Sequence, residues 1–157
     1  MSLVRAGILF LIYCHIINLR PVKMMSHKII QIPAKPYGIH LITKEISSAT
    51  ELKGTGMLHL FIQHTSAALA INENASPDVL FDTHDFFNVL VPENKHYRHS
   101  EEGPDDMPAH IKSILCSTSL AIPFQDNRLL LGVWQGIYLL EFRKKAGPRN
   151  IVVSQYF

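Results

Sequence analysis

The stretch that decides the fold of this chain reads HTSAALAINENASPDV and occupies residues 64–79. An apolar run at residues 57–63 leads into it, small and apolar residues fill its first half, and three polar side chains follow at residues 72–74. Residues 76–78, Ser-Pro-Asp, then favour a helix start, with a capping serine, a proline at the first helical position and an acid in the first turn. Polar groups on both sides of a hydrophobic stretch are typical of the edge of a core, where a pocket can form. We therefore expect the chemistry of this protein here.

Hydrophobic patterning divides the rest of the chain into short elements separated by turns. We expect strands at residues 28–33, 38–46, 57–63, 67–72, 119–124, 129–132, 137–143 and 150–155, a short helix at 47–53, and two main helices at 76–90 and 108–116. The helix at 76–90 is amphipathic, and its apolar residues are Val79, Leu80, Phe86, Phe87 and Leu90. Asp126-Asn127 suits a tight hairpin turn, because asparagine tolerates positive φ. The last four strands favour an antiparallel meander packed by the two helices, so the predicted class is α+β.

The composition is that of one globular domain. With 157 residues and 47% hydrophobic content, the chain can bury a real core. Three of its fifteen basic residues and none of its thirteen acids lie in residues 1–25, so the remainder has twelve basic groups against thirteen acidic ones. This near-neutral body gives no electrostatic reason to expect nucleic acid as a partner. Cys14 and Cys116 lie in dissimilar surroundings, which indicates a reducing compartment and a cytoplasmic location.

The first 25 residues differ from the rest, and we expect a leader or extension there, followed by a single domain over residues 26–157. Residues 6–17 are apolar apart from Cys14 and His15. Twelve residues are too few to cross a bilayer core, which needs ~20, so a membrane is not expected as a partner unless this segment acts as an anchor. Its basic flank also suits an organelle-targeting address, and a packed structural element is a third alternative.

Three histidines fall at the edges of predicted elements: His64 at the end of a strand, His99 in a loop and His110 in the first turn of a helix. Three imidazoles supported by a carboxylate such as Glu73 can build a zinc or iron site with one open position. The intervals of 34 and 10 residues between them match no local metal motif. Ordinary hydrogen-bonded histidines are therefore the alternative.

Two carboxylates are candidates for a catalytic role. Glu73 follows an apolar strand between Asn72 and Asn74, where it could hold a metal, a substrate amine or a proton with help from these amides. A surface carboxylate is the alternative. Asp106 ends the acidic run at residues 101–106, which otherwise resembles a solvated loop, and it immediately precedes the predicted helix.

A phosphate group has candidate partners but no dedicated loop. Thr65 and Ser66 could donate hydrogen bonds to it, and Lys112 and Arg128 could supply the countercharge. The chain has no glycine-rich phosphate loop, so helix ends, these side chains or a metal would have to hold the group. Trp134 is interpreted first as a core or subunit-contact anchor and second as a stacking surface for a planar ring.

Four segments together resemble the signatures of a known family. They are His64-Thr65-Ser66 with residues 71–74, residues 77–79 and Asp82; residues 106–112; Arg128-Leu129 with residues 131–138; and Arg149 with the strand after it. In this order, over about residues 29–153, they resemble the YjbQ-like family. The resemblance implies a small α+β protein that forms trimers, and it adds weight to the metal site because all three histidines fall within the matching range.

Members of that family are described as secondary thiamine-phosphate synthases. The resemblance thus implies an enzyme that joins an aminopyrimidine diphosphate to a thiazole phosphate and releases diphosphate, with a divalent metal at the histidines or Mg²⁺ carried in with the substrate. Because a phosphate loop and an aspartate-rich magnesium motif are missing from the sequence, a secondary activity fits better than a dedicated one. Two alternatives are a metal- or small-ligand-binding trimer without turnover, and a metal-dependent hydrolase or lyase.

Overall fold

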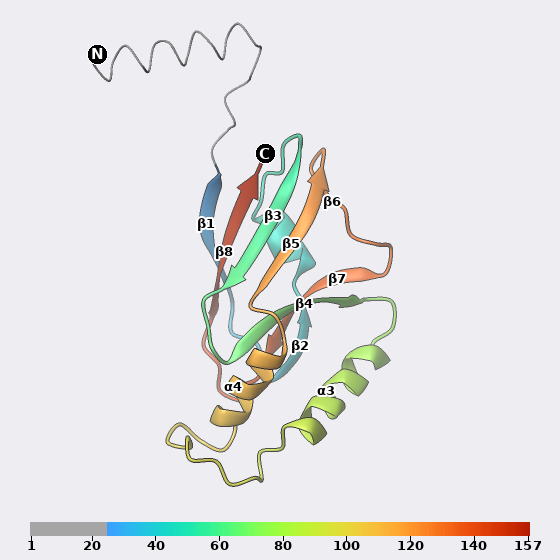
Figure 1. The fold of residues 1–157 in the computed structure, drawn as a ribbon. Helices are drawn as coiled ribbons and strands as arrows, with labels where there is room; N and C mark the ends of the chain where they lie inside the picture. The colour runs from blue at the N-terminus through green and yellow to red at the C-terminus, as the bar shows by residue number, and fades with distance from the viewer. Residues whose placement is uncertain (1–24) are drawn as a thin grey trace, which may run out of the picture.

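The computed structural model describes residues 25–157, which form two antiparallel sheets and three helices (Figure 1). The elements in chain order are β1 (Ser26–Ile32), β2 (Gly38–Leu41), α2 (Thr43–Ser48), β3 (Thr55–Ile62), β4 (Ala67–Glu73), α3 (Asp78–Leu90), α4 (Asp106–Leu115), β5 (Ser119–Gln125), β6 (Arg128–Leu129), β7 (Gln135–Glu141) and β8 (Arg149–Tyr156). The predicted α+β class and both main helices are confirmed.

The predicted meander of the last four strands is wrong. The larger sheet has the order β1-β8-β3-β5-β6 and the smaller one the order β2-β7-β4. β7 therefore belongs to the smaller sheet, whereas β6 and β8, its neighbours in the sequence, belong to the larger one. β8 pairs with both β1 and β3, at the opposite end of the chain. Only the β5–β6 hairpin joins consecutive strands of this region. Pairing here is decided by packing between distant segments, which strand patterns do not encode.

The molecule has three layers, in which β7 is buried on both faces. Ile137 and Leu139 point into the main core between the two sheets, whereas Tyr138 and Leu140 point into a second core. Ala109 of α4 belongs to this second core, and α3 packs beside it through Leu80 and Phe87, which are partly buried. α3 and α4 therefore cover the outer face of the smaller sheet, at the lower end of the molecule in Figure 1.

Two local predictions at the N-terminal end of the domain need correction. The strand expected at residues 38–46 ends at Leu41, and the chain continues as α2 where the sequence suggested a helix only at 47–53. Ile42 and Ile46 are completely buried four residues apart, which is helical rather than strand spacing. The strand expected at 129–132 is likewise reduced to the two residues of β6.

The hairpin turn is confirmed in detail. Asp126 and Asn127 both have positive φ, 47° and 64°, between the paired residues Gln125 and Arg128. Two left-handed residues in a two-residue loop are typical of a type I′ turn, whose twist matches that of the strands.

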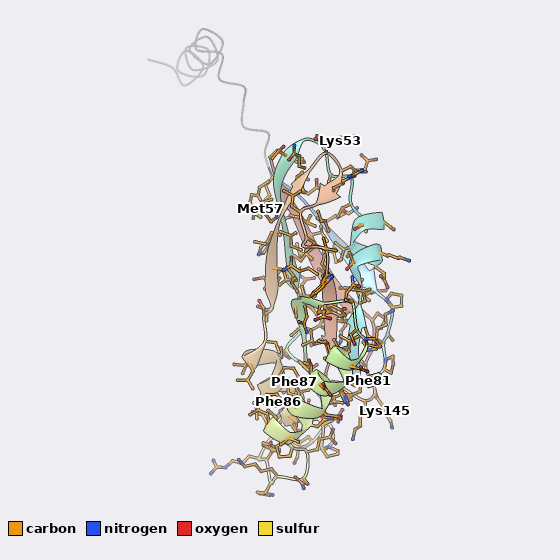
Figure 2. All side chains as sticks on the ribbon, turned by 90° about the vertical axis from the view of Figure 1, so that its right-hand side faces the viewer. Lys53, Met57, Phe81, Phe86, Phe87 and Lys145 are labelled. Carbon is orange, nitrogen blue, oxygen red and sulfur yellow. The ribbon has the colours of Figure 1, made fainter. Side chains whose placement is uncertain are left out.

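α3 is much less buried than its amphipathic pattern predicts. None of its residues is fully buried, and Phe81, Phe86, Val89 and Leu90 are exposed. Phe81, Phe86 and Phe87 lie along α3 at the end of the molecule opposite to Lys53 and Met57 (Figure 2). The helix thus presents an apolar face to its surroundings.

The predicted leader at residues 1–25 lies outside the described residues, apart from Met25. Among residues 25–157, no helix has the length and apolar character needed to cross a membrane.

Candidate metal centre

Asp106 and His110 come together because they are one turn apart on α4. Residues four positions apart share a helix face, and Oδ1 of Asp106 lies 3.4 Å from Nε2 of His110. The loop between α3 and α4 adds His99, whose Nε2 lies 2.9 Å from Oδ2 of Asp106. One ligand atom from each of the three residues lies within 4.8 Å of the others, which is compatible with a single cation. We call these residues the His–Asp cluster.

The carboxylate of Asp106 is 1% exposed and is held by charged neighbours. Nη1 of Arg143 contacts its Oδ1, and the same guanidinium pairs with Asp105 at 3.2 Å. Burial works against the charged form of Asp105, but the backbone N–H of Lys144 and the charge of Arg143 outweigh it and hold the pKa of that carboxyl below its usual value. Arg143 therefore joins the two carboxylates of the site, Asp105 and Asp106.

Oδ2 of Asp106 is the buried atom that fits a cation best. It accepts no hydrogen bond from the described residues, although Nε2 of His99 lies close to it. Buried carboxylate oxygens are normally hydrogen-bonded or bound to a metal. A cation between Oδ2 and the histidine nitrogens would satisfy it.

The tautomer of His110 also favours a bound cation. Its Nδ1 lies 2.9 Å from the carbonyl oxygen of Thr65, so Nδ1 carries a proton and donates it to that oxygen. In the neutral ring, Nε2 then carries a lone pair that faces the carboxylate of Asp106. Nε2 and the carboxylate oxygen are both acceptors, and a cation between them would bind both. A backbone carbonyl that fixes the outer nitrogen is the usual support of a metal-bound histidine. Two histidines and one carboxylate also match the ligand preferences of zinc and ferrous iron.

His64 is not a member of the His–Asp cluster, which corrects the predicted three-histidine set. Its Nε2 accepts the backbone N–H of Asn150 at 2.8 Å, and its Nδ1 lies 3.2 Å from Nη1 of Arg149. Burial, followed by the charge of Arg149, lowers the pKa of His64 against the opposing effect of Glu141. Asp106, which was predicted as a catalytic residue, takes the place in the cluster that was expected for His64.

His64 and His110, one member of the His–Asp cluster, line the same cavity. A hollow of about 460 Å³ is lined by His64, Thr65, Met107, His110, Ser113, Ile114 and Thr118. Thr65 connects the two histidines, because its carbonyl oxygen holds His110 while its neighbour is His64. A small molecule in this hollow would lie beside His110.

Lys112 lies on α4 but not beside the cluster. Its Nζ donates to the hydroxyl of Tyr37 at 2.6 Å and to Oδ1 of Asn88 at 3.1 Å, between α4 and α3. The side chain is fully buried, and no carboxylate of the described residues forms an ion pair with it. Burial lowers the pKa of Lys112 against the opposing charge of Glu93, with a smaller contribution from Lys144. Its contacts tie the helices together rather than facing the hollow that His64 and His110 share.

The other predicted site residues lie away from the cluster. Glu73 is at the far end of β4, six strand residues or roughly 20 Å from Ala67. There the backbone N–H of Asn74 donates to the carbonyl oxygen of Trp134 at 2.7 Å, and Asn72 lies one residue before Glu73. Arg128 is exposed on β6 in the larger sheet. The prediction that Glu73 lies within about one water of the histidines is therefore wrong for a single chain.

Sequence reasoning missed the two arginines that organise the site. Arg143 gave no signal, because its partners Asp105 and Asp106 are distant in the sequence. Arg149 forms a buried two-pronged pair with Glu141, with Nε–Oε2 at 2.7 Å and Nη2–Oε1 at 2.6 Å. The sequence did offer one signal for Arg149, because it lies in the last of the four segments that resemble the family.

Comparisons with known proteins give a consistent result. The model of the family described as UPF0047 protein YjbQ-like matches residues 28–156. The UPF0047 protein YjbQ of Salmonella typhimurium is 46% identical over 136 residues, which cover 83% of this chain and 97% of that protein. A UPF0047 protein of Synechocystis is 46% identical over 129 residues, covering 80% and 88% respectively.

Solved structures share the fold. A conserved hypothetical protein from Thermus thermophilus superposes with a TM-score of 0.70 at 31% identity, over 80% of this chain and 97% of that one. A protein of unknown function from Sulfolobus solfataricus, at 20% identity, has a TM-score of 0.72 over 84% and 96% of the two chains and shows the same fold. None of these names states a substrate or a reaction.

Proposed function

The chain belongs to the UPF0047 YjbQ-like family, and we propose that it is a metal-dependent enzyme acting on a small phosphate-bearing molecule at the His–Asp cluster. The observation that carries the proposal is the buried Oδ2 of Asp106, which accepts no hydrogen bond from residues 25–157 and lies beside two imidazoles. Zinc or iron suits these ligands, and Mg²⁺ brought in with a phosphate is the alternative.

The residues around the cluster would hold its side chains in place for metal binding. Thr65 holds His110 with Nε2 toward the carboxylate, and Arg143 holds the carboxylate of Asp106 in place. His99 comes from a loop and is 55% exposed, so the cluster is reachable from solvent. A divalent cation bound here would stabilise negative charge on a leaving phosphate or polarise a water.

The reaction we propose is the one that the family resemblance implies, as a secondary activity. The thiazole nitrogen attacks the methylene carbon of the aminopyrimidine diphosphate, the C–O bond breaks, and diphosphate leaves with the electron pair. Stabilising the leaving diphosphate is the main requirement. Support comes from the candidate metal centre, whereas Lys112, Arg128 and Glu73 lie apart from it in one chain.

A second candidate is a metal-binding trimer without turnover. It is favoured by one observation: the residues around the cluster are engaged in ion pairs and hydrogen bonds, and none is paired as a nucleophile with its base. We further propose a cytoplasmic location, supported by the dissimilar sequence surroundings of Cys14 and Cys116, with organelle targeting through residues 1–25 as the alternative.

Elemental analysis followed by turnover assays separates these functions. The purified full chain should hold about one zinc or iron per His–Asp cluster, and His110→Ala and Asp106→Asn should lose it while His96→Ala, in the same loop as His99, keeps it. Thiamine phosphate formation by the metal-loaded chain, lost in His110→Ala, would support the enzyme. Metal without any turnover would support the second candidate, and a chain that takes up no divalent metal would overturn both.

A further inference from the structure

A second hollow lies next to the one that contains His110. Its volume is about 450 Å³, and it is lined by Phe61, Ile62, Gln63, His64, Thr65, Ser66 and Thr118. We propose that it seats a phosphate group of the substrate, whose oxygen is bound by the Nδ1–H of His64, the hydroxyl of Ser66 and the Nη1 of Arg149. The inference deepens the proposed function and rests on it, because it places a second part of the same substrate beside the His–Asp cluster.

The hydrogen bonds of His64 make its Nδ1 a donor. Nε2 accepts the backbone N–H of Asn150 at 2.8 Å, so it has no proton of its own. A neutral imidazole then carries its proton on Nδ1. Nδ1 lies 3.2 Å from Nη1 of Arg149, which is also a donor. Two donors face each other here, and a single oxygen beside them would accept from both.

Arg149 is oriented so that one end of its guanidinium is left for this purpose. Nε and Nη2 both donate to the carboxylate of Glu141, at 2.7 and 2.6 Å. This pair is buried, so the guanidinium cannot turn without leaving a buried charge unpaired. Nη1 is consequently held toward His64.

Ser66 completes the set of donors. Nη2 of Arg149 reaches its Oγ at 3.4 Å, so the hydroxyl oxygen is the acceptor in that contact. Its O–H remains to donate, and both Ser66 and His64 line the hollow. The imidazole and the hydroxyl thus line the hollow, and the guanidinium of Arg149 contacts both of these side chains.

The chemistry of the donors selects the ligand. Phosphate oxygens accept several charge-assisted hydrogen bonds at once, and guanidinium groups suit them well. His64, Thr65 and Thr118 line both hollows, so a ligand can extend from this seat toward His110. Arg149 and His64 replace Lys112 and Arg128, which the sequence suggested as the partners of the phosphate.

Nitrogen-15 NMR of the histidine rings tests the seat directly. The full chain, labelled on histidine and freed of metal with a chelator, is titrated with inorganic phosphate, and His64 is assigned from the resonance lost in His64→Gln. We expect its Nδ1–H signal to shift and saturate. In Ser66→Ala the apparent Kd should rise about tenfold, as for the loss of one hydrogen bond to a charged group. Ser48→Ala, an exposed serine of α2, is the matched control and should bind like the wild type.

Three results would overturn the inference. They are a His64 signal that phosphate leaves unchanged in the wild type, a Ser66→Ala chain that binds as tightly as the wild type, and tighter binding of acetate than of phosphate at His64. Because the wild-type titration needs no variant to fold, it decides the first point alone. If the chain takes up metal but phosphate leaves the His64 signal unchanged, only this inference is overturned. If phosphate shifts the His64 signal but the chain takes up no metal, only the proposed function is overturned.

Discussion

The carbonyl oxygen of Thr65 lies 2.9 Å from Nδ1 of His110, and this contact between β4's leading turn and α4 sets the chemistry of the site. It places the proton of a neutral His110 on Nδ1 and leaves Nε2 facing Asp106 as a ligand atom. The same short turn carries His64 and Ser66, so the metal ligands and the proposed phosphate seat are positioned by adjacent residues.

Metal binding should stabilise the folded chain. At a free zinc concentration a hundred times the Kd, the free energy of unfolding should rise by about 2.7 kcal/mol, because the folded state alone presents the assembled ligands. His110→Ala should abolish this increase, whereas His96→Ala should retain it. Thermal unfolding with zinc and with a chelator measures the effect, and an equal increase in both variants would contradict the assigned ligands.

Gly56→Ala should destabilise the larger sheet. A Cβ on Gly56 would lie 2.7 Å from Cζ of Phe124 and would also meet the carbonyl oxygen of Tyr156. Overpacking of a core costs roughly 1–3 kcal/mol, and the backbone oxygen here cannot turn away. The free energy of unfolding in urea measures the loss.

Gly147→Ala is the matched control for this change. A Cβ at Gly147 would meet no atom within 4 Å, so we expect a change within about 0.5 kcal/mol. Equal stability of the two variants would show that β3 and β8 are not packed as described.

The buried ammonium of Lys112 should make stability depend on alkaline pH. Its pKa is lowered in the folded state, chiefly by burial, so between the folded and unfolded pKa values the unfolded chain binds more protons. Stability contributed by Lys112 therefore increases as the pH rises through this window and is reduced below it. Lys112→Met should remove the increase and leave stability at pH 7 equal or higher.

Urea unfolding at pH 7 and at alkaline pH measures this dependence. Lys145→Met, at an exposed lysine, should keep the wild-type dependence. A Lys112→Met chain that is strongly destabilised at pH 7 would show that its hydrogen bonds to Tyr37 and Asn88 outweigh the cost of burying its charge.

We predict that the chain forms a homotrimer through an interface that includes α3. Phe86 is 63% exposed and Val89 is 81% exposed, and large apolar side chains gathered on one helix usually mark an interaction surface. Phe86→Lys should dissociate the assembly without unfolding it. Sedimentation velocity measures the mass, with Met57→Lys at the opposite end of the molecule as the control (Figure 2). A wild-type monomer at micromolar concentration would contradict the prediction.

The sequence by itself determined the features that depend on neighbours along the chain. Asp126-Asn127 specified a two-residue turn because both residues tolerate positive φ, and the structure has it. Ser76 ahead of α3 and the small, apolar residues of β4 likewise specified a helix start and a strand; the Oγ of Ser76 accepts the N–H of Asp78 at 3.3 Å. The matching segments were sufficient to indicate the family, because they depend only on residue identity and order.

The tertiary structure alone decided which of the candidate residues meet. β8 lies between β1 and β3, and this pairing brings Asn150 and Arg149 to His64, 86 and 85 residues away. That contact engages Nε2 of His64 as an acceptor of the Asn150 N–H, and Asp106 rather than His64 lies with His99 and His110. Likewise, the packing of α3 on α4 buries Lys112 between them. A pattern of residue types records what a side chain can do, whereas its partners, its tautomer and its burial depend on segments that only long-range packing brings together.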